Sequence, residues 1–172
     1  NANGKISAWS NTTLVPGRHY SAAAVYNGYI YVSAGFASAM KNNVQYAKIV
    51  AENNGVIGPW TANTEVYTTT DRMYHSSVVY NGKIYIIGGM NAACDTVYND
   101  VQYATIDGST GAVGAWTTNS YPLNIGRMGH AVVAYNGYMY VLGGGPGQYS
   151  YTAKIEYAPI SAVDGSLGEW QY

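Results

Sequence analysis

Hydrophobic positions along the chain form one pattern that occurs three times, at residues 25–35, 79–89 and 134–144. In each copy an apolar run enters an Asn-Gly dipeptide, and a second run with bulky residues on both faces follows and ends on small residues. Asn-Gly is the strongest two-residue signal for a β-hairpin, and apolar residues on both faces are typical of a covered strand. The Tyr-Asn-Gly starts lie 54 and then 55 residues apart (26 to 80, 80 to 135), a spacing typical of repeat architectures.

Two further strands are predicted in each copy. The third strand is expected at residues 44–47, 101–104 and 155–158, and a turn rich in Gly, Asn and Asp leads from it to a fourth strand that carries one Trp. Each copy is therefore predicted to be a four-stranded antiparallel meander. The Trp strand occurs four times, whereas the hairpin occurs three times, so one extra strand precedes the first copy; the four are marked by Trp9, Trp60, Trp116 and Trp170.

These copies resemble the repeats of the kelch family, in which a strand ends on a double glycine, a spaced Tyr follows, and a Trp starts the outer strand. The first copy departs from this pattern with Ala34-Gly35. The second and third copies match it, with Gly88-Gly89, Tyr103, Trp116 and with Gly143-Gly144, Tyr157, Trp170. The resemblance implies β-propeller blades around a central channel, with the strand after each repeated Arg innermost and the Trp strand outermost.

The predicted fold class is therefore all-β, with three kelch-type blades and one extra outer strand at the N-terminus. We expect one domain over residues 1–172, with the outer strand of a preceding blade at 1–17 and blades at 18–71, 72–126 and 127–172. Three blades do not close a ring, because propellers need roughly four to eight. Either two chains pair into a six-bladed ring, or the chain is part of a larger propeller. The extra strand around Trp9 favours the second alternative.

Composition excludes several classes of partner. Charged residues make up 10% of the 172 residues and the net charge is −1, so neither nucleic acid nor an anionic membrane is an expected partner. No stretch approaches 18 apolar residues, which argues against membrane insertion. The chain starts at Asn1 without a signal-like run, which suggests a mature form or an excerpt. Few Lys and many Tyr, Asn and Thr suggest an extracellular or cell-surface location.

Five polar residues recur at equivalent places just before the hairpins. Arg18, Arg72 and Arg127 could form a ring at the channel mouth that binds carboxylates or sugars. Their repetition favours a structural role instead, in which each Arg bonds loop carbonyls. His75 and His130 follow two of them, but Ser21 stands in the third place and no carboxylate recurs beside them. Hydrogen bonding is therefore favoured over metal binding, and no metal or cofactor is predicted.

The connectors between the second and third strands differ in length and are rich in aromatic and amide side chains. Loops on a rigid frame are where recognition usually occurs. We therefore predict a ligand-binding loop face formed by Phe36, Asn42, Asn43, Met90, Asn91, Tyr98, Gln148, Tyr149 and Tyr151.

No catalytic constellation is recognisable, so the predicted function is a non-enzymatic, self-assembling scaffold that binds protein or glycan ligands. One alternative is a fragment of a kelch-type copper oxidase, which needs a Tyr/His copper constellation and a Cys-modified Tyr. The chain has His19, His75, His130 and Cys94, but no recognisable arrangement of them. The other alternative is a propeller fragment whose only property is oligomeric assembly.

Overall fold

The structure is a computed structural model that describes residues 13–14, 16–50, 55–66, 71–147 and 149–172, except for the side chains of 64–66. The extra outer strand predicted around Trp9 lies outside these residues. The described part contains strands and turns, and no helix in it is long and apolar enough to cross a membrane. The predicted all-β class is confirmed.

Blade 1 is an antiparallel sheet in which an Asn-Gly hairpin forms the two inner strands. These are β1 (Ala22–Tyr26) and β2 (Tyr29–Ser33), and β2 pairs with β3 (Asn43–Val50). The far edge of β3 pairs with β4 (Val56–Ile57) and then with β5 (Thr61–Val66), with an irregular register near the start of β3. Blade 1 therefore has the predicted meander, with its fourth strand divided in two.

Blade 2 is the most regular of the three sheets. Its strands β6 (Ser76–Tyr80), β7 (Lys83–Ile87), β8 (Val101–Ile106) and β9 (Val113–Thr118) pair in chain order, each antiparallel to the next. The turn between β6 and β7 is the predicted Asn-Gly turn, with both residues at positive φ, as this hairpin type requires.

Blade 3 contains β10 (Ala131–Tyr135), β11 (Tyr138–Leu142) and β12 (Ile155–Pro159). Its predicted fourth strand is reduced to two bridges, Ile160 to Leu167 and Tyr157 to Gln171. These bridges keep the same order as the β8–β9 pairing of blade 2, so the segment occupies the place of an outer strand without forming a continuous ladder.

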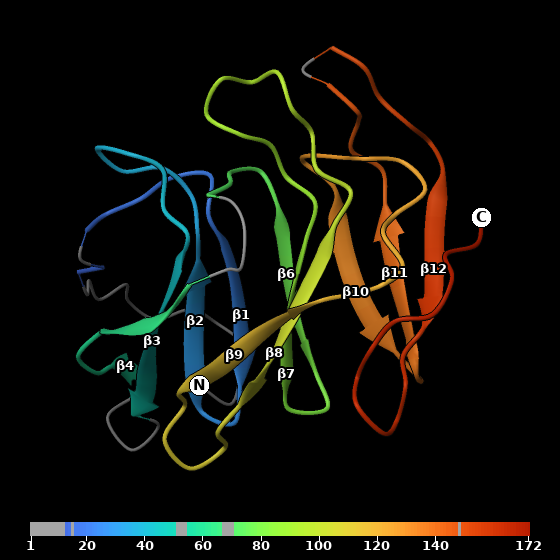
Figure 1. Ribbon diagram of the computed structural model, residues 1–172. Coiled ribbons are helices and arrows are strands. Elements are labelled where there is room, and N and C mark those ends of the chain that lie inside the picture. Colours follow the sequence, from blue (N-terminus) through green and yellow to red (C-terminus); the bar gives the residue numbers. More distant parts are fainter. Residues whose placement is uncertain (1–12, 15, 51–54, 67–70, 148) are drawn as a thin grey trace, which may run out of the picture.

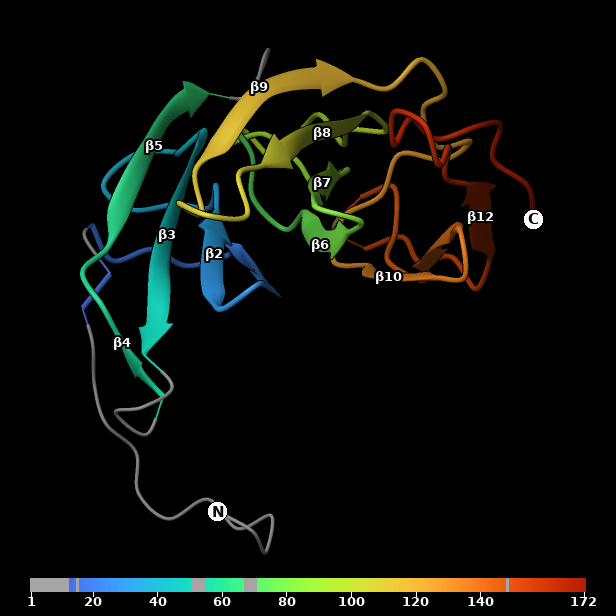
Figure 2. The same ribbon diagram turned by 90° about the horizontal axis from the view of Figure 1, so that it is seen from below.

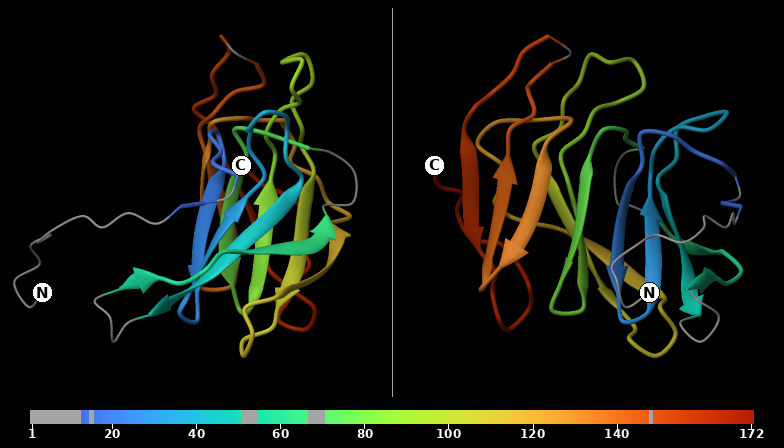
Figure 3. Two further views of the ribbon diagram at one scale, coloured as in Figure 1. Left: turned by 90° about the vertical axis from the view of Figure 1, so that its left-hand side faces the viewer. Right: turned by 180° about the vertical axis from the view of Figure 1, so that it is seen from behind.

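The three sheets lie side by side in an arc, with β6 and β10 on its inner side and β5 and β9 on its outer side (Figure 2). The inner strands contact one another, β1 with β6 and β6 with β10, and the outer strands β5 and β9 also meet. This is the arrangement that the resemblance implied. The connectors between second and third strands lie at the upper edge in Figure 1, and the Asn-Gly turns lie at the lower edge (Figures 1 and 3).

The hydrophobic core consists of two clusters, and each fills the space between neighbouring blades rather than the interior of one blade. The first joins blade 1 residues Tyr31, Ala34 and Val44 to Ile84, Ile86, Ala104, Ile106, Val113 and Trp116 of blade 2. The second joins Tyr85, Ile87 and Val101 of blade 2 to Met139, Val141, Ala158, Ile160, Leu167 and Trp170 of blade 3, with Leu123 beside them. Each joint therefore buries a tyrosine-bearing face of one blade against a tryptophan-bearing face of the next.

Candidate functional site

The candidate site is the upper edge of the arc, and its loops are held by the repeated arginines. In blade 2 the Arg72 guanidinium donates to the Gly88 carbonyl at 2.8 Å and to both carboxylate oxygens of Asp100, each at 2.8 Å. Its other face lies 4.8 Å from the centre of the Tyr98 ring. Burial raises the pKa of Asp100, but the hydrogen bonds and charge of Arg72 outweigh burial, so the pKa of Asp100 is lowered overall. One side chain thus connects the end of β7 to the start of β8.

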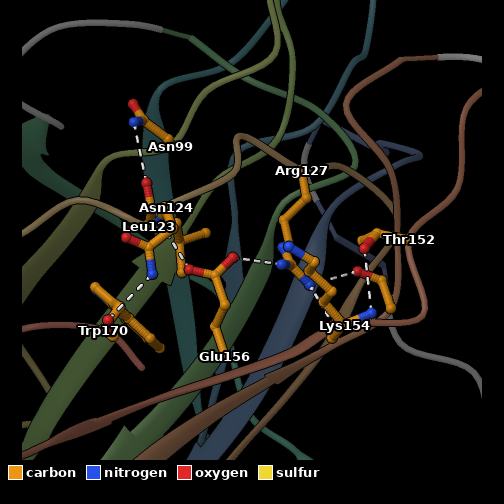
Figure 4. A network of polar contacts seen from close by, with 9 residues as sticks. Asn99, Leu123, Asn124, Arg127, Thr152, Lys154, Glu156 and Trp170 are labelled. Carbon is orange, nitrogen blue, oxygen red and sulfur yellow. Dashed lines mark hydrogen bonds and ion pairs between the residues drawn. The ribbon is translucent and has the colours of Figure 1, made fainter. Parts of the chain in front are cut away.

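Blade 3 repeats this arrangement with a more deeply buried pair. Arg127 donates to the carbonyls of Gly143 at 2.9 Å and Lys154 at 3.1 Å, and it forms an ion pair with Glu156 (Figure 4). The second carboxylate oxygen of Glu156 accepts the Asn124 backbone N–H at 2.7 Å. Both partners of the ion pair are fully buried.

In blade 1 the equivalent contacts are weaker. Arg18 is half-buried and donates to the Ala34 carbonyl and to the Asn43 side-chain oxygen, each at 3.1 Å, so its partner is a neutral amide. All three arginines bond the carbonyl of the small residue that directly follows the second strand. Arg72 and Arg127 have no exposed surface, which favours the structural role over direct binding of a ligand.

His75 and His130 lie at the two joints between blades and are 6% and 7% exposed. His75 Nε2 is 2.9 Å from the Ser33 hydroxyl, which is 2.7 Å from the Ser77 hydroxyl. Burial, reinforced by Arg72 and His130, lowers the pKa of His75 to about 3, and burial with Arg127 lowers the pKa of His130 to about 4. Both are neutral at pH 7. Within the described residues no three His, Cys, Asp or Glu side chains come together as a metal site.

The predicted loop-face residues divide into three groups by exposure. Tyr149 and Tyr151 are 85% and 84% exposed on the third connector. Met90 is 2% exposed and packs in the protein interior, so it is excluded from the binding surface. The rest of the described set is half-buried: Phe36, Asn42, Asn43, Asn91 and Tyr98, whereas Gln148 lies outside the described residues.

Several half-buried residues of the predicted loop face already contact other parts of the protein, which leaves less of their side chains available to a ligand. Asn43 accepts from Arg18, and Tyr98 lies against Arg72. The Asn91 side chain donates to the Asp95 carboxylate at 2.6 Å and accepts from the backbone N–H groups of Asp95 and Thr96. These residues shape the connectors, and the exposed tyrosines are the groups they present.

The sequence reading missed an aromatic pair on the same segments as the arginines. Tyr20 and Tyr74 stack with ring centres 4.3 Å apart, and Tyr20 is 47% exposed. A hydrogen bond to Tyr20 raises the pKa of Tyr74 to about 12. Both residues have positive φ, as does Gly129 at the equivalent place in blade 3. Their position two residues after each repeated Arg was the available sequence signal.

Comparison with known proteins supports the repeat assignment. The family model described as "Kelch motif" matches residues 71–102. Beta-scruin of Limulus polyphemus is 29% identical over 134 residues, which are 74% of this chain and 13% of that protein. The chain thus spans a small part of that relative. The solved structure titled "Structure of YjhT" superposes with a TM-score of 0.73 at 11% identity, over 96% of this chain and 48% of that one.

Proposed function

Because the chain is built of kelch repeats folded as propeller blades, we propose that it is a binding scaffold whose upper loop edge recognises a protein or a glycan. The observation that carries the proposal is the contrast between exposed and fixed residues at this edge. The aromatic side chains of Tyr149, Tyr151 and Tyr20 are exposed, while the connectors around them are held by buried arginines.

The buried arginines make this edge suitable for recognition. A loop that is already held in one conformation loses less conformational entropy when a ligand binds. Arg72 and Arg127 connect both ends of their connectors through backbone carbonyls and carboxylates, and these contacts do not depend on a ligand. The edge is therefore preorganised, with variable connectors on a repeated frame.

The exposed tyrosines favour ligands with flat or amphipathic surfaces. A tyrosine offers a large apolar ring with a polar tip and has only two side-chain torsions to fix, which suits both protein and sugar contacts. The stacked pair Tyr20 and Tyr74 adds an aromatic surface beside the connectors. Net charge contributes little, since the chain carries only −1.

The copper oxidase alternative has less support from the described residues. His75 and His130 are buried at separate joints, and His75 bonds Ser33. Cys94 is exposed on the second connector, where its thiol lies 3.7 Å from the Ala92 carbonyl. Two of the three histidines thus take part in the packing between blades, which favours the scaffold over a copper centre. A non-enzymatic role and an extracellular or cell-surface location remain predictions from the sequence.

A binding screen tests the loop edge directly. The 172-residue chain would be screened against an oligosaccharide array and a displayed peptide library, and hits measured by titration calorimetry. Replacing both Tyr149→Ser and Tyr151→Ser is expected to weaken binding about tenfold or more, because interface tyrosines are frequent hot spots. The matched control is Val163→Ser, 97% exposed in the turn that follows β12, which should bind normally. Binding that survives the double replacement would place the ligand elsewhere.

A further inference from the structure

The outward face of blade 3 carries a pocket of about 420 Å³, lined by Tyr138, Tyr140, Tyr157, Pro159 and Gln171. Tyr140 and Tyr157 stack at its centre with ring centres 6.2 Å apart, and Tyr138 is 40% exposed. We call this surface the Tyr face of blade 3. It is an unpartnered sheet face, and the rest of the molecule shows what covers such a face.

Blades 1 and 2 carry the same stacked pair at equivalent positions. Tyr31 and Tyr46 stack at 6.1 Å, and Tyr85 and Tyr103 stack at 5.8 Å. Tyr31 and Tyr85 have no exposed surface, because the next blade packs over each of them. In blade 3 the equivalent Tyr140 stays partly exposed. The Tyr face is therefore a surface that this fold covers with a further blade.

The cover comes from the turn before the Trp strand of the following blade. At the second joint the Tyr85 hydroxyl donates to the Gly165 carbonyl at 2.8 Å. At the first joint Tyr29 donates to the Ser109 carbonyl at 3.2 Å, and a Cβ on Gly111 would lie only 2.4 Å from the Tyr29 ring. A glycine in this turn thus lets the backbone approach the ring closely.

A second contact recurs at the lower edge. The Tyr80 hydroxyl accepts the backbone N–H of Gly137, in the Asn-Gly turn of the next blade, at 2.8 Å. The Tyr26 hydroxyl lies against Gly82 in the same way, 3.4 Å from the position of a Cβ. The equivalent Tyr135 of blade 3 is 75% exposed. Blade 3 therefore presents every tyrosine that the internal joints use.

Blade 1 presents the opposite surface, which we call its Trp face. Five apolar side chains that are at most 7% exposed in blade 2 are only half-buried in blade 1. The blade 2 residues are Ile84, Ile86, Ile106, Val113 and Trp116, and their blade 1 equivalents are Ile30, Val32, Ile49, Ile57 and Trp60.

The turn glycine of blade 1 matches as well. Gly55 has φ +79°, close to +75° at Gly111 and +76° at Gly165. Its N–H donates to the carbonyl of the last residue of β3, and the N–H groups of the other two glycines donate to the carbonyls at the equivalent positions of their blades. Among the described residues, none lies within 4 Å of a Cβ built on Gly55. The two ends of the arc thus carry the two halves of one joint.

We propose that the Tyr face of blade 3 receives the Trp face of a second copy, with Gly55 against the tyrosines, and that two copies close a six-bladed ring. The occupant is a second copy because the matching surface is on this same chain. Since the joint is heterologous, two copies related by a twofold axis form it twice, so that both faces of each described arc are covered.

Light scattering of the 172-residue chain tests this joint. We expect a concentration-independent mass of twice 18.4 kDa. Tyr140→Glu should yield an 18.4 kDa monomer, with the dissociation constant raised about 100-fold or more, because a joint buries this position and an unpaired carboxylate there is not solvated. Val163→Glu adds the same charge at a 97% exposed site and should stay dimeric. Circular dichroism would check that each variant is folded.

A variant on the other face distinguishes a heterologous joint from a symmetric contact between two Tyr faces. Ile57→Glu is expected to dissociate the pair as Tyr140→Glu does. A wild-type monomer, a dimer that persists in either variant, or larger oligomers that grow with concentration would overturn the proposal. The proposed ring is independent of the proposed binding function of the loop edge. A monomer that binds a ligand would contradict only the ring, and a dimer that binds no ligand would contradict only the binding function.

Discussion

The joint between blades 1 and 2 and the joint between blades 2 and 3 use the same backbone contacts. The Gly35 N–H donates to the Arg72 carbonyl and the Gly89 N–H to the Arg127 carbonyl, both at 2.9 Å. Along the segments that follow these arginines, the Tyr74 N–H donates to the Tyr20 carbonyl and the Gly129 N–H to the Tyr74 carbonyl, at 3.1 and 2.8 Å. The spacing of the blades is thus set by main-chain groups.

The side chains at the two joints differ in polarity. At the first, His75 contacts the Ser33 hydroxyl, which in turn contacts the Ser77 hydroxyl, and the Asp100 partner of Arg72 is 25% exposed. At the second, Ile87 and Val132 occupy the positions of these serines beside His130, and the Glu156 partner of Arg127 is fully buried. A repeat can therefore exchange polar for apolar side chains at a joint while the main-chain contacts stay, and the largest energetic consequences should follow buried charge.

The largest difference between the joints is expected from removal of the arginines. Arg127→Met should lower the free energy of unfolding by about 3–5 kcal/mol, because it leaves the Glu156 carboxylate buried without a cation. Arg72→Met should cost less, because water can reach the partly exposed Asp100. Urea unfolding followed by tryptophan fluorescence measures both.

A double variant sharpens this first comparison. In Arg127→Met with Glu156→Leu no unpaired charge is left, so it should be more stable than Arg127→Met alone. Equal losses of unfolding free energy in Arg127→Met and Arg72→Met would contradict the conclusion that the ion pair at the second joint is less accessible to water than the pair at the first.

Both histidines are expected to make the free energy of unfolding depend on pH. Their pKa values in the folded chain are lowered to about 3 and about 4, against about 6.5 in the unfolded chain. Below pH 6.5 the unfolded chain therefore binds more protons, and each histidine lowers the free energy of unfolding by about 1.4 kcal/mol per pH unit, or about 2 kcal/mol at pH 5. Above pH 6.5 neither contributes.

Single variants separate the two joints in this experiment. His75→Gln and His130→Gln should each reduce the slope of stability against pH by about one proton between pH 6 and 5. Below about pH 4 both contributions should level off, because the histidines of the folded chain then take up protons as well. An unchanged slope in either variant would show that its histidine is not held neutral by the joint.

The sequence was sufficient to predict the fold because its signals are local and repeated. The Asn-Gly turns and the spaced Tyr and Trp each specify their own strand, and their repetition excludes other arrangements. Ala34 was the visible departure, and it occupies the position of Gly88 with a positive φ of 46°, so the turn persists with a less suitable residue. The division of β5 from β4 was not predicted, although Gly58-Pro59 is a local signal for it, because proline has no backbone N–H to donate to a neighbouring strand.

The candidate site was less predictable because exposure depends on packing between blades. Met90 and Tyr151 are both apolar connector residues in the sequence, yet one is 2% and the other 84% exposed. The sequence offered loop carbonyls as partners for the arginines, but Arg72 and Arg127 are also fully buried and pair with Asp100 and Glu156, which lie almost 30 residues away. The periodic pattern of the sequence does not indicate how deeply these arginines are buried.

The smallest expected effect is at the serine that makes the first joint polar. Ser33→Ala should lower the free energy of unfolding by about 1 kcal/mol, because it removes the hydroxyl that meets both His75 and Ser77. Adding Ser77→Ala should cost little more, since the two hydroxyls share one contact and their losses are not additive. Urea unfolding at pH 7 measures this difference with Ile87→Val at the second joint as the control. If Ser33→Ala were neutral and Ile87→Val were not, apolar packing alone would hold both joints and the polar contact would be incidental.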